Sequence, residues 1–423
     1  MIENCKNWAG NFEFSAARFH RPKSVEEIQD LVKSCKRLKA LGTRHSFNNI
    51  ADTSEDLISL EHLDQVVALD RQHCTVSVEP GIKYGELCRY LHQEGFAVHN
   101  LASLPHISVA GACATATHGS GDSNGNLSTA VAGMEIVTAK GEVVVLSREK
   151  HPEQFQGAVV GLGGIGIVTK LTLDIVLAFD ICQVVYENLP LSQLEDHFDD
   201  ITSLAYSVSL FTDWRNDTFN QLWLKHRISD DDTFNSPPEL FGATLTADHL
   251  HPIPGHSAKN CTEQMSIPGP WHERLSHFRM DFMPSSGEEL QSEYLVPRQN
   301  AVAALLEIHQ IGEQIASHLL ISEVRTIAAD NLWMSPCYRQ ACVAIHFTWK
   351  QNWPAVKKLL PMIEEKLAPF RARPHWGKLF TMLAEQLQLH YEKLPDFRQL
   401  LREYDPQGKF RNAFLNKYIF GEL

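Results

Sequence analysis

Two short segments alternate polar and apolar side chains, which is the period of a β-strand. The polar pair is Glu323 and Arg325 in the first segment and His346 and Thr348 in the second. Alternate side chains of a strand share one face, so each pair is predicted to point in one direction. A carboxylate, a guanidinium, an imidazole and a hydroxyl on one wall suit the binding of a polar ligand. The spacing alone fits two ordinary solvent-facing strands equally well.

A second group of candidates lies in two loops that are rich in small residues. Residues 41–47 read L-G-T-R-H-S-F, and residues 95–121 contain no Asp, Glu, Lys or Arg. The second stretch also holds three His and many Ser and Thr, so it is not a membrane span. Small residues let backbone approach a large ligand, while hydroxyl and N–H groups supply donors without charge. We therefore expect buried backbone wrapped around a ligand here.

Three familiar motifs occur in the wrong context. Residues 161–166 match G-x-G-x-x-G, but a helix precedes them and a strand follows, the reverse of a dinucleotide fold, so we predict a tight turn. Residues 121–125 match G-x-S-x-G without a hydrophobic strand before them. His272 and His277 stand five apart, whereas a zinc helix needs a spacing of four. We assign no nucleotide fingerprint, no nucleophile elbow and no metal.

The elements that must position these residues form a mixture of helices and strands. Ser24 and Glu27 form a capping box before a predicted helix with apolar residues at helical spacing. Composition shifts near residue 180, and a turn at 405–410 precedes a short tail. Further helices are predicted at 84–93, 153–160 and 301–319, and strands at 38–41, 57–60, 66–69, 75–78, 135–139, 142–146, 165–175, 207–211 and 344–349. No simple βαβ rhythm appears, which indicates an α+β fold.

Length and charge narrow the class of protein. The 423 residues, with a mass of 47.7 kDa, predict two domains, possibly three. Lys and Arg number 38 against 51 Asp and Glu, for a net charge of -13, which argues against nucleic acid and anionic membranes as partners. The nine cysteines are scattered without a C-x-x-C pair, and the first residues lack an apolar stretch. We expect free thiols, a cytoplasmic location and no membrane partner.

The two loops together resemble the FAD-binding domain of the vanillyl-alcohol oxidase and p-cresol methylhydroxylase family. The second loop reads P-H-x-S-V-A-G, then six residues, then H-G-S-G, starting at Pro105. The resemblance is strongest to the alditol oxidase group, which is related to sugar-lactone oxidases. It covers nearly the whole chain, including N-W-A-G-N at 7–11, residues 206–215, P-H-W-G-K at 374–378 and N-A-F at 412–414.

This resemblance implies a two-domain flavoprotein. The FAD-binding domain would span residues 1–178 and be completed by about 375–423, with a substrate-binding cap at 179–374 whose antiparallel sheet covers the flavin ring. His45 would bond covalently to the flavin 8α-methyl group. Related loops often have Gly where this chain has Arg44, and a positive φ there would strain an arginine. The implied FAD-binding residues are Leu41, Gly42, Thr43, Arg44, His45, Ser46, Ser103, Ser108, Gly111, Ala114, Thr115, Thr117, His118, Gly119, Ile167 and His375.

The resemblance also implies an activity. A terminal alcohol of an acyclic polyol, such as xylitol or sorbitol, would pass hydride to flavin N5, and O2 would be reduced to H2O2. Arg325 and Lys378 would polarise the reacting hydroxyl and Ser103 would hydrogen-bond it, while Glu323, His346 and Thr348 would bind the other hydroxyls. We expect a monomer. The alternatives are an aldonolactone oxidase or dehydrogenase of the same family, and a non-catalytic flavin-binding protein.

Overall fold

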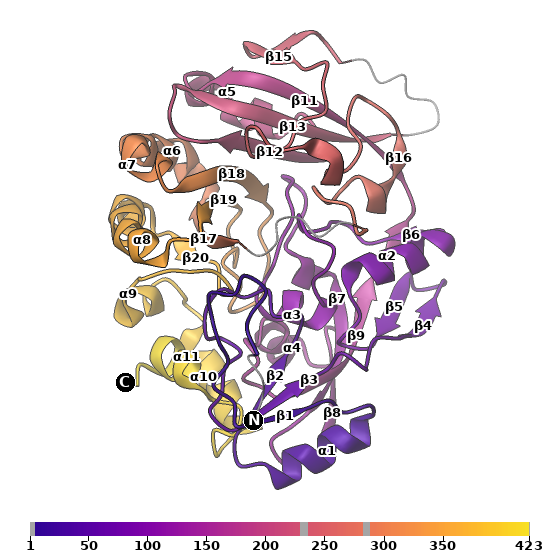
Figure 1. Ribbon diagram of the computed structural model, residues 1–423. Helices are drawn as coiled ribbons and strands as arrows, with labels where there is room; N and C mark the ends of the chain where they lie inside the picture. Colours follow the sequence, from indigo (N-terminus) through magenta and orange to yellow (C-terminus); the bar gives the residue numbers. More distant parts are fainter. Residues whose placement is uncertain (1–4, 229–235, 282–287, 423) are drawn as a thin grey trace.

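The computed structural model describes residues 5–228, 236–281 and 288–422. The first four residues, part of the segment inspected for a leader, lie outside this range. Figure 1 shows a long sheet in the upper half of the molecule and a mixed lobe below it, with the C-terminal helices beside that lobe. The predicted mixture of helices and strands is confirmed.

The N-terminal lobe, from β1 to β10, carries two principal sheets. One is parallel, with the order β1-β3-β2, and the other is antiparallel, with the order β4-β5-β9-β7-β8. The strands are β1 Arg18–His20, β2 Leu38–Leu41, β3 Asp56–Ser59, β4 Val66–Asp70, β5 Thr75–Val78, β7 Val131–Val137, β8 Val143–Ser147 and β9 Ile167–Asp174; β6 Phe96–Ala97 pairs with β10 Val176–Leu177. Buried and half-buried residues alternate along β9, as the sequence pattern predicts for a strand with one core face.

Seven helices belong to this lobe or pack beside it within the described residues. They are α1 Val25–Ser34, α2 Tyr84–Gln93, α3 Val109–Ala114, α4 Pro152–Val159, α9 Ala384–Gln388, α10 Leu394–Tyr404 and α11 Ala413–Leu415. The Ser24 hydroxyl accepts a hydrogen bond from Glu27 N, so the predicted helix start is confirmed. Phe397 and Phe414 from the C-terminal helices share a buried cluster with Leu87 of α2. The end of the chain therefore completes the core of the N-terminal lobe.

The long sheet contains ten strands within the described residues and is antiparallel throughout. Its order is β14-β15-β11-β13-β12-β18-β19-β17-β20, and β16 also pairs with β11. The strands are β11 Asp180–Pro190, β12 Ser207–Thr212, β13 Thr218–Ile228, β14 Glu239–Leu240, β15 Ala243–Leu245, β16 Gly269–Pro270, β17 Glu289–Pro297, β18 Leu319–Ile327, β19 Cys342–Lys350 and β20 Arg373–Pro374. The predicted antiparallel sheet in the middle of the chain is confirmed.

Helices cover one face of the long sheet. They are α5 Gln193–Thr202, α6 Ala301–His309, α7 Gly312–Ala316 and α8 Trp353–Leu367, and Figure 1 shows α6 to α8 along one side of the sheet. Val324, Ile345 and Phe347 pack in one buried cluster with Leu305 of α6 and Leu360 of α8. Because strand side chains alternate, the intervening polar residues of β18 and β19 point to the opposite face.

The helix predicted for residues 301–319 is wrong in its second half. The chain forms two helices, separated after His309, and Leu319 already belongs to β18. The break brings Gly312 against the backbone of Trp214, where an added Cβ would lie 2.3 Å from the Trp214 carbonyl oxygen. Tertiary packing therefore overrides the local helical pattern.

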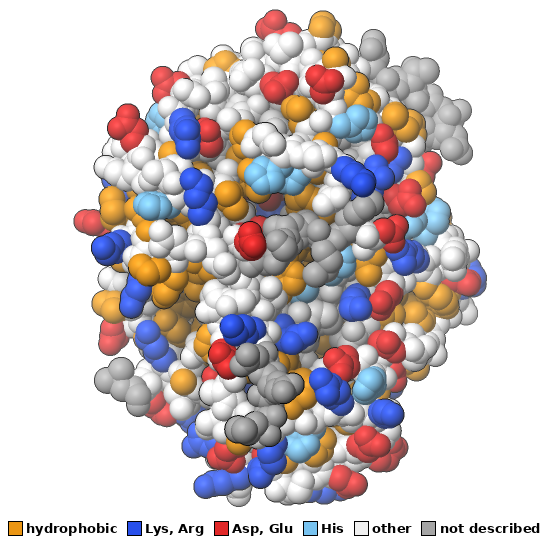
Figure 2. All heavy atoms as spheres, viewed as in Figure 1, with side chains coloured by type: hydrophobic (Ala, Val, Ile, Leu, Met, Phe, Trp, Pro, Cys, Tyr) orange, Lys and Arg blue, Asp and Glu red, His pale blue; other side chains and the backbone are white. Residues whose placement is uncertain are grey.

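The cysteines form no disulfide bonds within the described residues, and the surface carries charges of both signs. All nine cysteines are free, as predicted from their number and spacing. On the face viewed in Figure 2, Lys and Arg side chains are interspersed with Asp and Glu. Within the described segments, no helix is both long enough and apolar enough to cross a bilayer.

Candidate active site

A cavity of about 1390 Å³ lies where the N-terminal lobe meets the long sheet. Its lining includes the loop at 41–48, the small-residue segment at 102–118 and polar residues of β17, β18 and β19. Sites for one small ligand usually measure about 300–1,000 Å³. The cavity is therefore large enough for a dinucleotide cofactor together with a substrate.

Both ends of the chain hold the loop that contains His45. The N–H of Trp8 donates to Arg44 O at 2.8 Å, and the N–H of Phe47 donates to Gly377 O at 2.8 Å. Asn48 extends the second connection, because its side-chain amide donates to Trp376 O and Lys378 O. The N-W-A-G-N and P-H-W-G-K motifs therefore fix this loop from two sides.

The backbone of this loop is suited to binding a negatively charged or electron-rich ligand. Arg44 has a φ of 64°, the left-handed conformation that glycine adopts most easily. Within the described residues, the N–H groups of residues 43–46 donate to no other group. Successive free N–H groups around a left-handed residue form a concave donor site. The strained backbone at Arg44 is therefore part of the turn that places the free N–H groups of residues 43–46 at the cavity wall.

His45 is held as a neutral imidazole. Its ring stacks on Trp8 with centroids 5.4 Å apart, and its Nδ1 lies 3.1 Å from the Thr43 hydroxyl. Burial, assisted by the charges of Lys378 and His106, lowers the pKa of His45 to about 3. At neutral pH the ring therefore keeps a lone pair, which a nucleophile requires.

Ser108, Gly42 and Gly111 form a close-packed cradle. The Ser108 hydroxyl is buried and has no hydrogen-bond partner within the described residues. A Cβ added to Gly42 would lie 2.6 Å from this hydroxyl oxygen, and one added to Gly111 would lie 2.8 Å from it. A side chain at either position would have to displace this hydroxyl, and the exposed backbone of both glycines borders the cavity. An unpaired hydroxyl beside bare backbone fits the polar part of a cofactor such as FAD.

Most of the predicted cofactor residues line the cavity, and two do not. The residues that line it are Leu41, Gly42, Thr43, Arg44, His45, Ser46, Ser103, Ser108, Gly111, Ala114, Thr115, Thr117, His118 and His375. Ile167 packs instead with Ile28 and Val137 on the far side of β9, whereas its neighbours Gly166 and Val168 face the cavity. Gly119 lies against Asn100. Strand alternation explains why the prediction at Ile167 misses the cavity by one residue.

The four polar residues singled out on two strands form one wall. Glu323 of β18 pairs in register with His346 of β19. Glu323, Arg325, His346 and Thr348 are each no more than 8% exposed and all line the cavity. The alternative of a solvent-facing sheet is therefore wrong. Ser103 also borders the cavity, and its hydroxyl accepts a hydrogen bond from Arg325 Nη1 at 3.3 Å.

Sequence reasoning missed Glu293 of β17, which also lines the cavity as part of this wall. Its Oε1 accepts a hydrogen bond from Arg325 Nη2 at 2.7 Å and lies 3.4 Å from nitrogens of His118 and His346. Burial acts to raise the pKa of Glu293, but these neighbours outweigh it and hold the pKa well below its usual range. Residues 289, 291 and 293 are polar, but Ser292 stands between the last two, so the clean polar and apolar alternation of β18 and β19 is missing here.

Lys378 completes the polar wall. Its Nζ donates to Gln291 Oε1 and lies 4.9 Å from the centre of the Phe47 ring. Burial lowers the pKa of Lys378 to about 8, with the charge of Glu293 opposing the change and that of Arg325 adding to it. The amine can therefore exchange a proton near neutral pH, which Arg325 cannot do because its pKa is raised.

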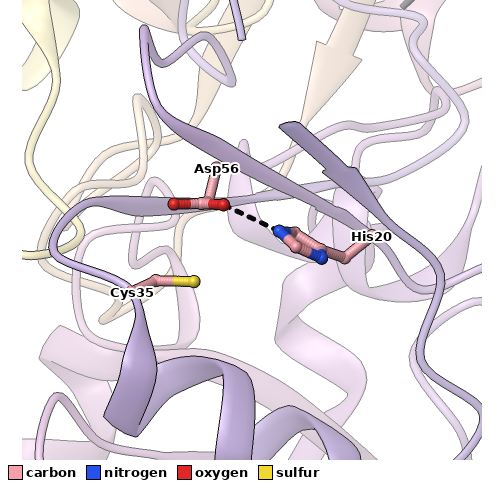
Figure 3. Close-up of side chains that lie close together, drawn as sticks. All are labelled: His20, Cys35 and Asp56. Atoms are coloured by element: carbon pink, nitrogen blue, oxygen red, sulfur yellow. Dashed lines mark hydrogen bonds and ion pairs between the residues drawn. The ribbon is translucent and has the colours of Figure 1, made fainter. Parts of the chain in front are cut away.

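A separate cluster of possible metal ligands lies at His20, Cys35 and Asp56 (Figure 3). Asp56 is already engaged, because Arg18 donates to both of its oxygens at 2.6 Å and His20 Nε2 lies 2.7 Å from one of them. A cation in this position would have to displace the guanidinium. We read the cluster as a structural ion pair and assign no metal to it.

Comparison with known proteins identifies the class. Residues 16–147 match the family described as FAD binding domain, and residues 282–418 match the family described as D-arabinono-1,4-lactone oxidase. Together with the two-part fold and its large interior cavity, these matches define a flavin-dependent oxidoreductase. The predicted α+β fold class and the predicted membership of an FAD-binding family are confirmed.

An alditol oxidase from Streptomyces sp. (strain IKD472 / FERM P-14339) is 46% identical over 418 residues, covering 98% of this chain and 99% of the relative. The chain belongs to the alditol oxidase family of FAD-dependent oxidases. It is also 25% identical over 452 residues to L-gulonolactone oxidase from Mus musculus, with 98% of each chain covered. The crystal structure of cholesterol oxidase from B. sterolicum shares the fold, with a TM-score of 0.77, 13% identity and coverage of 99% and 96%.

Proposed function

We propose that this enzyme oxidises the terminal alcohol of an acyclic polyol, such as xylitol or sorbitol, to the aldose. The observation that carries the proposal is the buried polar wall, which presents side chains for several hydroxyl groups at once: Ser103, Glu323, Arg325, His346, Thr348 and Lys378. A neutral substrate with many hydroxyls can pair with each of these groups without adding charge. The kinship with an alditol oxidase supports the same substrate class.

FAD, when bound, supplies the hydride acceptor for the alcohol and returns the two electrons to O2, giving H2O2. The donor loop at 43–46 and the cradle around Ser108 would hold it. His45 would attach it covalently, which its neutral ring supports. His45→Ala tests the attachment. Acid precipitation should leave flavin with the wild-type protein but release it from the variant, and release from the wild type as well would refute the linkage.

Arg325 and Lys378 would act on the reacting hydroxyl. The Arg325 guanidinium stays charged, so it polarises the hydroxyl oxygen and stabilises developing alkoxide charge. Lys378 has a pKa of about 8, so its free amine is the group best suited to accept the hydroxyl proton as hydride departs. The Ser103 hydroxyl, already bonded to Arg325, would orient the same oxygen.

Glu323, His346 and Thr348 would bind the remaining hydroxyls. Glu323 is ionised, because Arg325 and His277 outweigh the effect of burial and hold its pKa far below normal. An ionised carboxylate accepts hydrogen bonds only, so it would accept one from a substrate hydroxyl. A site built to pair hydroxyls strongly rejects analogues that lack them, because its own buried groups would be left unpaired.

The test is to record O2 uptake and H2O2 formation with xylitol, sorbitol and L-gulonolactone under identical conditions. Equal amounts of O2 consumed and H2O2 formed with the polyols, and little turnover of the lactone, would support the proposal. Turnover of the lactone alone would favour the aldonolactone alternative. Transfer to an artificial acceptor without O2 uptake would indicate a dehydrogenase. No turnover with any of these substrates would favour a non-catalytic flavin-binding protein.

The free thiols support the expected cytoplasmic location.

A further inference from the structure

A buried line of polar side chains runs from the interior of the long sheet to the cavity wall. It starts at Lys225 of β13, which is only 1% exposed to solvent. The Lys225 Nζ lies 2.6 Å from Leu275 O, 2.9 Å from Ser276 O and 3.2 Å from His277 Nδ1. These three acceptors match the three N–H groups of the ammonium form, which has no acceptor of its own. Burial lowers the pKa of Lys225 to about 7, with the charge of Glu323 opposing the change, so the ammonium form prevails below neutral pH.

This arrangement fixes the protonation of His277. Glu323 is ionised and can only accept hydrogen bonds, so the neutral His277 ring carries its proton on Nε2, and Nδ1 keeps a lone pair towards Lys225. Nε2 lies 2.7 Å from Glu323 Oε1, where it donates a hydrogen bond. Burial lowers the pKa of His277 to about 4 although Glu323 opposes this, so the ring is neutral at pH 7. His277 therefore relays a hydrogen bond from Lys225 to Glu323.

The hydrogen bond from His277 determines which carboxylate oxygen of Glu323 is available to a ligand in the cavity. One carboxylate oxygen is committed to His277, while the other lies 3.6 Å from Arg325 Nε. That Arg325 nitrogen has no hydrogen-bond partner within the described residues. The rings of Phe211 and Trp223 enclose His277 edge-on, at 5.6 and 5.3 Å. His277 and Phe211 both border the cavity, and with one oxygen engaged by His277 the second oxygen of Glu323 is the one left for a ligand.

The same loop also holds Ser103. The N–H groups of His277 and Phe278 both donate to Ser103 O, at 3.2 and 3.3 Å. The Ser103 side chain in turn accepts from Arg325. The segment around His277 therefore connects the small-residue loop of the N-terminal lobe to the polar wall of the long sheet.

We infer that Lys225 and His277 are positioning residues that hold Glu323 as the acceptor for a substrate hydroxyl remote from the reacting carbon. This inference rests on the proposed function, since it assigns a task to one group of the same site. Neither residue lies among those the family resemblance implied. Their effect is on recognition of the polyol chain, so it should appear in substrate affinity rather than in the limiting rate of hydride transfer.

The experiment measures anaerobic flavin reduction in the purified holoenzyme at pH 7, with xylitol and with 1,2-butanediol, which has no hydroxyl beyond its second carbon. In Lys225→Met and His277→Phe, the half-saturating xylitol concentration should rise roughly tenfold to hundredfold, the effect of losing a hydrogen bond to a charged group. The limiting rate, and both constants for 1,2-butanediol, should change by less than about threefold. His277→Gln, which keeps an N–H donor towards Glu323, should restore most of the xylitol affinity.

The matched control is His272→Gln, five residues earlier in the same loop, where the imidazole contacts His92 and lies away from the cavity. It should leave all constants unchanged. Equal losses for xylitol and 1,2-butanediol, or no loss for either, would overturn the inference. Failure of wild-type enzyme to be reduced by xylitol would instead overturn the proposed function.

A second measurement does not depend on how the variants fold. In wild-type enzyme labelled with 15N-histidine, the His277 ring should show a bonded proton on Nε2 and a lone pair on Nδ1 at pH 6, where Lys225 is charged and His277 neutral. Selective broadening by a paramagnetic polyol analogue bound in the cavity identifies the signal in the wild-type protein. A proton on Nδ1, which a neutral lysine would impose, or an imidazolium ion would refute the relay.

Discussion

Glu293 and Arg325 form an ion pair of 2.7 Å on two strands that flank β19, and both side chains are at least nine-tenths buried. Glu293 lies opposite His346 in the register of β17 and β19, and Arg325 lies on β18. Removing one partner of a buried pair leaves an uncompensated charge. The pair therefore fixes the position and charge of the guanidinium that faces the substrate.

Glu293→Gln should lower both stability and the rate of flavin reduction by xylitol. We expect a loss of about 3 kcal/mol in the free energy of unfolding, because Arg325 stays buried without its anion. The charge of Glu293 also supports protonation of Lys378, so the variant should move the pH dependence of reduction to lower pH. Urea unfolding and anaerobic stopped-flow measurements check the two effects.

Glu364→Gln is the control for this change. Glu364 pairs with Tyr294 and Thr381 away from the cavity, so its variant should lose stability but keep the wild-type rate and pH dependence. If Glu293→Gln behaved in the same way as this control, the ion pair would have no role in the site.

The limiting rate of flavin reduction should rise as pH increases through about 8. Burial brings the pKa of Lys378 from its usual 10.5 to about 8, so the free amine that accepts the proton accumulates above that pH. Lys378→Met should reduce the rate by a factor of roughly 10²–10⁴ and remove the inflection. A wild-type rate that falls above pH 8 would show that the ammonium form is required instead.

Substitutions at Arg44 should report the strain in the His45 loop. Arg44→Gly keeps the positive φ at no steric cost and should retain full flavin attachment. Arg44→Val, a β-branched residue, should destabilise the protein by about 1–2 kcal/mol and lower the covalently bound flavin fraction. Thermal unfolding and the flavin remaining after acid precipitation measure these effects. Equal behaviour of the two variants would mean that this backbone conformation is not needed.

Asp56→Asn should lower the free energy of unfolding by up to about 1 kcal/mol at pH 7, because the Arg18 side chain that loses its charged partner is largely exposed to solvent. Arg18 lowers the pKa of Asp56 to about 2 in the folded protein, so this stabilisation is present above pH 4 and lost as pH falls towards 2. The difference from wild type should therefore shrink between pH 4 and pH 2. The exposed Asp70→Asn is the control and should change stability little. A difference that persists at pH 2 would contradict the assignment.

The local part of the fold could be read from the sequence, because period and capping are local properties. The helix at Tyr84–Gln93 and the strand at Thr75–Val78 have the predicted bounds. The polar faces of β18 and β19 were also visible from their alternation. What sequence alone left open was which side of the sheet is buried, and burial depends on how the two lobes meet.

The parts of the site that sequence reasoning missed depend on long-range register. Glu293 follows the polar Ser292, so its strand lacks a clear polar face in the sequence, and only pairing of β17 with β19 brings it to Arg325. Lys225 reads as an ordinary strand residue until the loop that carries His277 folds over it. The two predicted cofactor residues that miss the cavity, Gly119 and Ile167, each lie one residue from a position that lines it.

The most direct test of the central claim is an anaerobic absorption spectrum of the purified enzyme before and after the addition of xylitol. A polyol oxidase should show the visible absorption bands of a yellow flavin, and xylitol should bleach the longer-wavelength band within one turnover. Admission of O2 should restore the band and yield one H2O2 for each aldose formed. Flavin bands that xylitol, sorbitol and other polyols all leave unchanged would contradict the account.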